Sequence, residues 1–457
     1  PREDSAALGV NGVELDTAHI RDSGAIYVYV KEGSQWLKQA YLKSPASGIE
    51  EWFGRSIALS GDGNTLVVGA DGESSNAKGI NGDSSNDLAS DSGAAYVFTR
   101  ENESWTQPFY LKSDNSRQGD LFGFDVDISS DGNTIVVGAK GEDSATTGVY
   151  SVDLVSDTII NSGAVYVFTK EAGSWVQKAY IKASNTGQND FFGNTVATCS
   201  DGSVIAIAGV SEDSNAVGLE GDQTNDDLNS SGAVYIFEKS SGVWSQKSYV
   251  KASNPMEDAV FGTSLDISDD CSTLVVGAHG DKSTSTGVDG SESDGSLNFA
   301  GAAYVFLRGS SDWEQQAYIK ASNTAQADFF GTGVVLSGDG NVMAVSALQE
   351  SSAATGVNGD QADDSKSKAG AVYVFSRELG IWSQVSYVKA ANTGTTINFG
   401  GTALSSVGGY PVVSNISMDS AGTTFAAGAA YEDTSGEGVN GNLTVNGAIN
   451  SGAVYLY

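Results

Sequence analysis

Basic residues are scarce in this sequence, with 24 Lys and Arg against 57 Asp and Glu, so the formal net charge is −33. Recognition of nucleic acid and of anionic lipid depends on clustered Lys and Arg that displace counterions. We therefore expect no nucleic-acid partner. We also expect no membrane insertion, because no segment approaches the roughly 18 consecutive apolar residues of a spanning helix. The acidic excess is compatible with a cationic partner, and Ca²⁺ is the first candidate.

Cysteine and histidine are rarer still. The two cysteines, Cys199 and Cys271, exclude a disulfide-dense scaffold. The two histidines, His19 and His279, lie far apart in the sequence, and neither has a nucleophile motif nearby. Motifs of metalloproteases, serine hydrolases and phosphate-binding loops do not occur. We therefore predict that the chain is not an enzyme. Because paired carboxylates are plentiful, a glycan-active hydrolase or lyase stays as an alternative.

A long repeat organises the chain. The pair Phe-Gly recurs at intervals of 69 or 70 residues, at Phe53, Phe122, Phe192, Phe261, Phe330 and Phe399. A second motif, SGAVYVF or a close variant, begins at Ser23, Ser92, Ser162, Ser231, Ala300, Ala369 and Ser451. We therefore predict a single domain over residues 1–457. Its repeats are 1–52 (partial), 53–121, 122–191, 192–260, 261–329, 330–398 and 399–457 (partial).

Each complete repeat predicts four β-strands, which we name strands A, B, C and D in chain order. Runs rich in Val, Ile, Tyr, Phe and Trp alternate with Gly, Asp, Asn and Ser, the pattern of strands and turns. Helical periodicity is absent. Asp-Gly between strands A and B supplies the positive φ of a tight turn. Cys271 replaces this glycine in the repeat 261–329, so we expect a wider turn there.

Strands B and C, such as VVGA and GAVYVF, are apolar at nearly every position, so both faces of these strands must be covered. Four-stranded sheets stacked face to face are the blades of a β-propeller. We predict an all-β propeller of four-stranded antiparallel blades, most simply seven, with incomplete first and last blades. The alternative is a six-bladed ring that closes strands A and B of the last repeat onto C and D of the first. That ring would leave residues 451–457 surplus.

Phe-Gly opens strand A and Gly-Ala closes strand B, and Pro1 stands where a strand B has just ended. This pattern resembles the FG-GAP repeat of integrin α-subunit propellers. The GAVYVF text and the run W-x-Q-x-x-Y-x-K-A-S-N resemble still more closely bacterial surface proteins with tandem copies. Some integrin A–B hairpins bind calcium through D-x-[DN]-x-D-G-x-x-D. The A–B turns of this chain, such as SGDGNT, depart from that pattern, because they offer too few carboxylates for the 6 to 8 oxygen ligands of Ca²⁺.

Acidic residues concentrate instead in the long loops between strands B and C. Carboxylates and amide oxygens at such density, with a Gly for a sharp turn, can wrap a hard cation. The simpler interpretation is that Asn, Gly, Asp and Ser are what exposed loops are made of. If Ca²⁺ is a cofactor, we expect its ligands among Asp83, Asp87, Asp222, Asp226, Asp360 and Asp364.

Six of the seven tryptophans occupy the same position of strand D, which favours packing between blades: Trp36, Trp105, Trp175, Trp244, Trp313 and Trp382. Trp52 alone is out of phase, so we predict that it contacts a ligand.

These features predict a non-enzymatic extracellular or cell-surface module for binding or adhesion, with a protein or glycan ligand on the loop-bearing face. The structural alternative is a subunit of an extracellular assembly or filament that self-associates through its incomplete end blades, as in strand addition.

Overall fold

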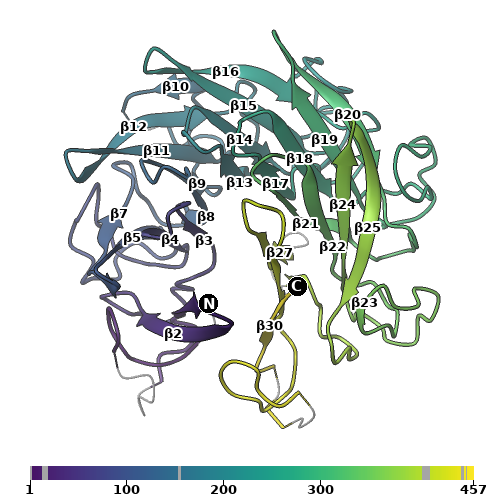
Figure 1. Cartoon of the computed structure of the whole chain (residues 1–457). Coiled ribbons are helices and arrows are strands. Elements are labelled where there is room, and N and C mark those ends of the chain that lie inside the picture. The colour runs from purple at the N-terminus through teal and green to yellow at the C-terminus, as the bar shows by residue number, and fades with distance from the viewer. Residues whose placement is uncertain (1–2, 13–18, 153–155, 404–411, 444–446, 449) are drawn as a thin grey trace. The chain divides into compact units, whose positions relative to one another are not determined.

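The computed structural model describes residues 3–12, 19–152, 156–403, 412–443, 447–448 and 450–457. All regular secondary structure in these ranges is β-strand, as Figure 1 shows, which confirms the all-β prediction. Among the described residues, no helix has the length and apolar composition that a membrane span requires. The chain divides into two compact units, residues 1–209 with 235–247 and residues 210–234 with 248–457.

The described strands of residues 1–260 form four sheets. The first sheet has only two strands, β1 (Ile26–Glu32) and β2 (Gln35–Leu42). The second contains β3 (Ile57–Leu59), β4 (Thr65–Ala70), β5 (Ala94–Glu101), β6 (Ser104–Trp105) and β7 (Phe109–Leu111). The third contains β8 (Phe122–Ile128), β9 (Thr134–Ala139), β10 (Gly148–Tyr150), β11 (Ala164–Glu171) and β12 (Ser174–Lys182). The fourth contains β13 (Phe192–Thr198), β14 (Val204–Gly209), β15 (Ala233–Ser240) and β16 (Val243–Val250).

Three further sheets follow along the chain. The fifth contains β17 (Ser264–Ile267), β18 (Thr273–Ala278), β19 (Ala302–Arg308) and β20 (Trp313–Ile319). The sixth contains β21 (Phe330–Leu336), β22 (Val342–Ala347), β23 (Gly356–Val357), β24 (Ala371–Glu378) and β25 (Ile381–Lys389). The last contains β26 (Gly401–Ala403), β27 (Val412–Ser414), β28 (Ile416–Met418), β29 (Phe425–Ala429) and β30 (Ala453–Leu456).

The described residues therefore form a β-propeller with six blades of four or five strands, not the seven that the sequence predicts. Among the described residues, the first repeat forms the two-stranded sheet β1–β2. The six-bladed alternative predicts the number of blades correctly, but its prediction for the C-terminal residues is wrong. Residues 453–456 form β30, which pairs with β29 in the last sheet, so this segment is not surplus.

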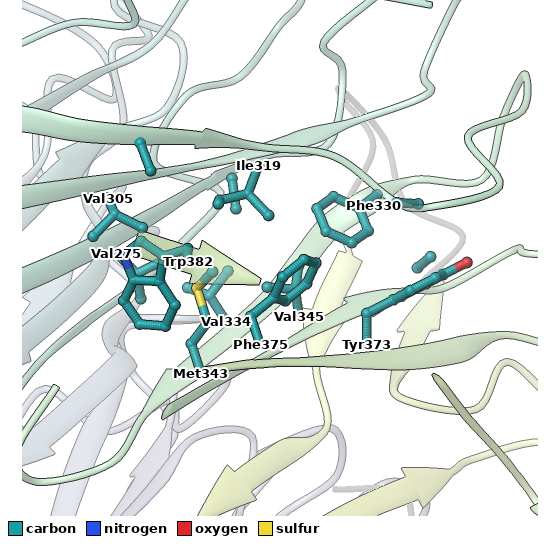
Figure 2. Packing of buried hydrophobic residues seen from close by; sticks show 14 of the residues in the cluster. Val275, Val305, Ile319, Phe330, Val334, Met343, Val345, Tyr373, Phe375 and Trp382 are labelled. Atoms are coloured by element: carbon teal, nitrogen blue, oxygen red, sulfur yellow. The ribbon is translucent and has the colours of Figure 1, made fainter. Parts of the chain in front are cut away.

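The repeated sequence motifs explain how the sheets pack. All six residues of β4, β9, β14 and β18 are buried, which confirms that strand B is covered on both faces. Figure 2 shows one such core in residues 248–457, where side chains of β18, β19 and β20 meet those of β21, β22, β24 and β25. The strand-D tryptophans belong to these cores. Five of them are 3–7% exposed, and Trp36 of the two-stranded sheet is half-buried.

The Asp-Gly turns form as predicted, with φ of 68° at Gly63 and 70° at Gly132. The expected wider turn at Cys271 is wrong. Cys271 adopts the same left-handed conformation, with φ of 60°, and its N–H donates to the Ser268 carbonyl at 2.9 Å. The equivalent bond from Gly63 to Ser60 is 2.8 Å, so the turn keeps its shape although a side chain replaces the glycine hydrogen.

Candidate functional site

Long loops leave each blade at the end where strand A begins and strand B ends, which we call the loop-bearing end. An ion pair with a buried lysine lies there in the partial first repeat and in every complete repeat. Lys112 is representative: its Nζ lies 2.8 Å from Glu73 Oε2 and 2.6 Å from Ser92 Oγ. The pairs are Lys43–Glu3, Lys112–Glu73, Lys182–Glu142, Lys251–Glu212, Lys320–Asp281 and Lys389–Glu350. Since the arrangement recurs with the repeat, it is part of the blade and not a unique site.

The asparagine of the K-A-S-N text joins one blade to the next. Asn115 Nδ2 donates to Glu142 Oε1 at 3.2 Å, and the Tyr166 hydroxyl donates to Asn115 Oδ1 at 2.8 Å. A matching bond at 3.0 Å connects Asn323 to Glu350. These contacts bury the first acid of the loop motif Glu-Asp-Ser. That glutamate is therefore a structural residue.

The predicted calcium ligands all lie on exposed loops. Asp83, Asp222 and Asp360 each accept the backbone N–H of the residue two positions later, at 2.9–3.0 Å, which is a local turn. Burial raises the pKa of Asp328 to about 7, and repulsion by Glu350 and, more weakly, by Asp364 adds to this rise. Burial and the repulsion of Glu73 raise the pKa of Glu51 to about 8, with a smaller contribution from Asp87. The calcium assignment itself stays a prediction.

One group of charged side chains breaks the repeat, and all its members lie in residues 1–209. We name it the Arg55–Lys140 cluster. Its members come from three successive blades, where strand A begins or strand B has just ended: Arg55, Asp71, Phe124, Asp125, Lys140 and Asn194.

Phe124 of β8 holds the two cations of this cluster. The Arg55 guanidinium carbon lies 4.3 Å from the Phe124 ring centre, and Lys140 Nζ lies 3.4 Å from it. Cations are attracted to aromatic faces at such distances. Lys140 Nζ also donates to Asn194 Oδ1 at 3.4 Å. Trp52 borders the cluster, with Arg55 5.9 Å from its ring centre.

Asp71 is the buried anion of the cluster. Its Oδ2 lies 3.4 Å from Arg55 Nε, and its side chain is 2% exposed. In the part of the chain that the structure describes, the other oxygen, Asp71 Oδ1, is buried without a hydrogen-bond partner. Leaving such an oxygen unpaired costs about 1 to 3 kcal/mol.

The cluster also shifts the pKa values of its members toward neutrality. Burial raises the pKa of Asp71 to about 6, against the attraction of Arg55. Burial and the repulsion of Arg55 lower the pKa of Lys140 to about 7. Asp125 accepts hydrogen bonds from Ser56 Oγ at 2.7 Å and Val196 N at 2.8 Å, and burial raises its pKa to about 6. Perturbed values gathered in one place are typical of functional sites.

The equivalent positions in other blades lack this chemistry. Outside the cluster, the residues after Phe-Gly include Thr263 and Thr332, and those after strand B include Val210, His279 and Leu348. Of this region, the sequence predicts only Trp52 as a site residue. The charges of Arg55, Asp71 and Lys140, at positions where other repeats are neutral, are the signal in the sequence that marks the rest of the cluster.

Repeat, sheet pairing and buried core together define a β-propeller. A family model described as "FG-GAP repeat" matches residues 244–306 and 313–375, which confirms the resemblance seen in the sequence. No curated protein matches the sequence.

Two solved structures are similar over most of their length. One is a putative 6-phosphogluconolactonase from Bacteroides uniformis, at 12% identity and a TM-score of 0.47, with 98% of both chains covered. The other is the periplasmic gluconolactonase PpgL of Pseudomonas aeruginosa, at 14% identity and a TM-score of 0.43, with 94% of both covered. Because both neighbours are named as lactonases, the prediction that this chain is not an enzyme is contradicted, and we withdraw it. Their identities and TM-scores are too low to assign an activity.

Proposed function

We propose that the protein is an extracellular or cell-surface binding module that takes a carboxylate-bearing protein or glycan ligand at the Arg55–Lys140 cluster. The observation that carries this proposal is the pair of cations on one aromatic ring, in a chain whose net charge is −33. Blade packing does not require it, since equivalent positions elsewhere are neutral. Asp71 contacts Arg55, and Asp125 accepts hydrogen bonds from Ser56 and Val196. The hydrogen bond printed for Lys140 goes to the neutral Asn194, so an added carboxylate would supply this lysine with a direct counter-charge.

The neighbouring groups suit such a ligand. Guanidinium groups bind carboxylates in a planar, charge-assisted arrangement. Trp52 is half-buried beside Arg55 and offers an indole edge or face to a sugar ring or an apolar side chain. Burial keeps the pKa of Lys140 near 7, and a bound anion would raise it. Binding should therefore take up a proton at pH 8, where free Lys140 is largely neutral.

Titration calorimetry tests the proposal with three probes: an oligogalacturonate, an acidic peptide and a neutral oligosaccharide. We expect only the two acidic probes to bind. Tighter binding of the oligogalacturonate would indicate a glycan ligand, and tighter binding of the peptide would indicate a protein ligand. Arg55→Ala and Lys140→Met should each weaken binding at least tenfold, about 1.4 kcal/mol. Lys239→Met is the matched control, because Lys239 also lies over an aromatic ring, 5.8 Å from Trp244, outside the cluster. Equal affinity in all three variants would contradict the assignment of this site.

A glycan-active hydrolase or lyase is the second candidate, favoured by the near-neutral pKa values of Asp71, Asp125 and Lys140. A general acid and base work best when their pKa values lie near the working pH. The measurement is release of new reducing ends or unsaturated products from a uronate polymer at pH 5 to 8. If Asp71→Asn abolishes turnover but still binds the polymer, the result would favour catalysis. If the protein binds the polymer and releases no product, the enzymatic candidate would be excluded.

A further inference from the structure

Lys140 differs from the buried lysines of the repeat in the partner of its side chain. The Nζ atoms of Lys112 and Lys182 lie 2.8 and 2.7 Å from a glutamate oxygen. The Nζ of Lys140 instead donates to the amide oxygen of Asn194 at 3.4 Å. An amide oxygen accepts such a bond from a neutral amine as well as from an ammonium group. This contact therefore does not require Lys140 to carry a charge.

Burial and a second cation favour the neutral form of this lysine. Its Nζ lies 3.4 Å from the centre of the Phe124 ring and 5.5 Å from that of the Phe191 ring, so the two rings replace water around the amine. Burial and the repulsion of Arg55 lower the pKa of Lys140 to about 7, against the attraction of Asp71. About half of the amine is then neutral at pH 7, whereas an ordinary lysine is neutral in less than roughly one molecule in a thousand.

A neutral lysine amine is a nucleophile toward aldehydes and ketones, and a neighbouring cation is one of the environments that activate it. Arg55 is that cation, because its guanidinium carbon lies 4.3 Å from the same Phe124 ring. Lys140, Arg55 and the adjacent Trp52 are each only half-buried. A small ligand can therefore touch the guanidinium and the amine together.

We propose that the Arg55–Lys140 cluster takes an oxo acid, a carboxylate that also carries an aldehyde or ketone, and holds it covalently as an imine of Lys140. This inference rests on the proposed function and narrows its ligand class. Arg55 binds the carboxylate in a charge-assisted contact. In a 2-oxo acid the carbonyl carbon is bonded to that carboxylate, so the contact presents the reacting carbon to the neighbouring amine. The reducing end of a uronate glycan carries the same two groups in its open-chain form.

The covalent step needs no oxidant or reductant. The neutral Nζ of Lys140 attacks the carbonyl carbon, a C–N bond forms, and one proton moves from nitrogen to the former carbonyl oxygen. That oxygen then leaves as water, which gives a C=N bond, and the imine nitrogen takes up one proton. The product is a cation, so it keeps its attraction to the ligand's carboxylate and to the Phe124 ring. The step is reversible by addition of water.

Reductive trapping on the full chain tests this proposal. Cyanoborohydride converts an imine into a stable secondary amine, so the modified lysine gains the mass of the probe minus one oxygen. We expect pyruvate or galacturonate at pH 7 to label Lys140 at least tenfold more than Lys239, as measured by mass spectrometry of the digested protein. Lys239 is the matched control, because it is also half-buried and lies over an aromatic ring, 5.8 Å from Trp244. Stronger labelling by galacturonate would indicate a glycan end, and stronger labelling by pyruvate a small oxo acid.

Two further probes separate this inference from the proposed function. Lactate has the carboxylate and no carbonyl, so it should compete with pyruvate without labelling, and acetone has the carbonyl alone and should label at least tenfold less. Arg55→Ala should lower labelling by pyruvate at least tenfold, and Lys140→Arg, which keeps a cation but no nucleophilic amine, should abolish it at this position. Lactate that binds in calorimetry while pyruvate leaves Lys140 unlabelled, or labels Lys239 equally, would overturn the imine alone. Equal labelling by acetone, with no competition by lactate, would overturn the carboxylate site as well.

Discussion

Gly123 and Gly173 have nearly the same positive φ, 85° and 84°, but very different surroundings. A Cβ added to Gly123 would lie 2.2 Å from the Ala94 carbonyl oxygen, whereas a Cβ on Gly173 meets nothing within 4 Å. The glycine of Phe-Gly is therefore required by space as well as by backbone angle. The glycine of the C–D turn is required by backbone angle alone.

We predict that Gly123→Ala lowers the free energy of unfolding by at least about 3 kcal/mol, because a left-handed alanine costs about 1 to 2 kcal/mol and backbone overlap adds to it. Gly173→Ala, the matched control, should cost only the first amount. Denaturant melts of both variants give the comparison. Losses of equal size would show that close packing at Phe-Gly does not matter.

Lys182 tests the buried ion pair in the same way. Its side chain is 0% exposed and that of its partner Glu142 is 2% exposed, so Lys182→Met leaves a buried carboxylate without a counter-charge. We predict a loss of about 3 to 5 kcal/mol. Lys178 lies on the same strand as Lys182, and Lys178→Met breaks an exposed pair with Glu171 of β11, so it should cost at most about 1 kcal/mol. Similar losses in chemical denaturation would contradict the structural role of the buried pair.

At the scale of elements, the sequence predicts the strands well and the sites less well. The four-strand repeat and the doubly buried strand B follow from VVGA and GAVYVF, because period and apolarity are local properties. The blade number does not follow, since it depends on which sheet edges find a partner. The Arg55–Lys140 cluster does not follow either. Arg55, Asp71 and Lys140 lie 16 to 85 residues apart and meet only through the stacking of blades.

The acidic loops carry the metal prediction. If Asp83 and Asp87 bind Ca²⁺, calcium at 100 times its Kd stabilises the fold by about 2.7 kcal/mol. We expect the midpoint of thermal unfolding to rise with CaCl₂ and to fall again with a chelator. Asp83→Asn with Asp87→Asn should reduce this rise. MgCl₂ at equal ionic strength is the control, and an equal rise with both salts would mean charge screening without a calcium site.

At the scale of the whole molecule, the acidity reaches into the interior. Burial raises the pKa of Glu51 and Asp120 to about 8, and that of Asp266 and Asp328 to about 7. In an unfolded chain such groups titrate near 4. Between about pH 4 and 8 the folded protein therefore holds protons that the unfolded chain releases, and this contribution to stability falls as pH rises. His279 acts oppositely, since burial lowers its pKa to about 4 and it disfavours folding below about pH 6.5.

We predict that the carboxyl groups prevail, because these four, together with Asp71 and Asp125, outnumber His279 and Lys140, whose lowered pKa values act in the opposite direction. The chain's net charge of −33 at pH 7 also repels itself more as pH rises. The midpoint of thermal unfolding should be higher near pH 5.5 than at pH 8. Asp120→Asn keeps the shape of the side chain and removes its titration, so it should flatten this dependence. Asp83→Asn, at an exposed loop carboxylate, should not. A midpoint that rises from pH 5.5 to 8, or a slope unchanged by Asp120→Asn, would mean that these interior acids are ionised in the fold. Their carboxylates would then need hydrogen bonds or cations as partners, and the loop-bearing end would be the first place to look for them.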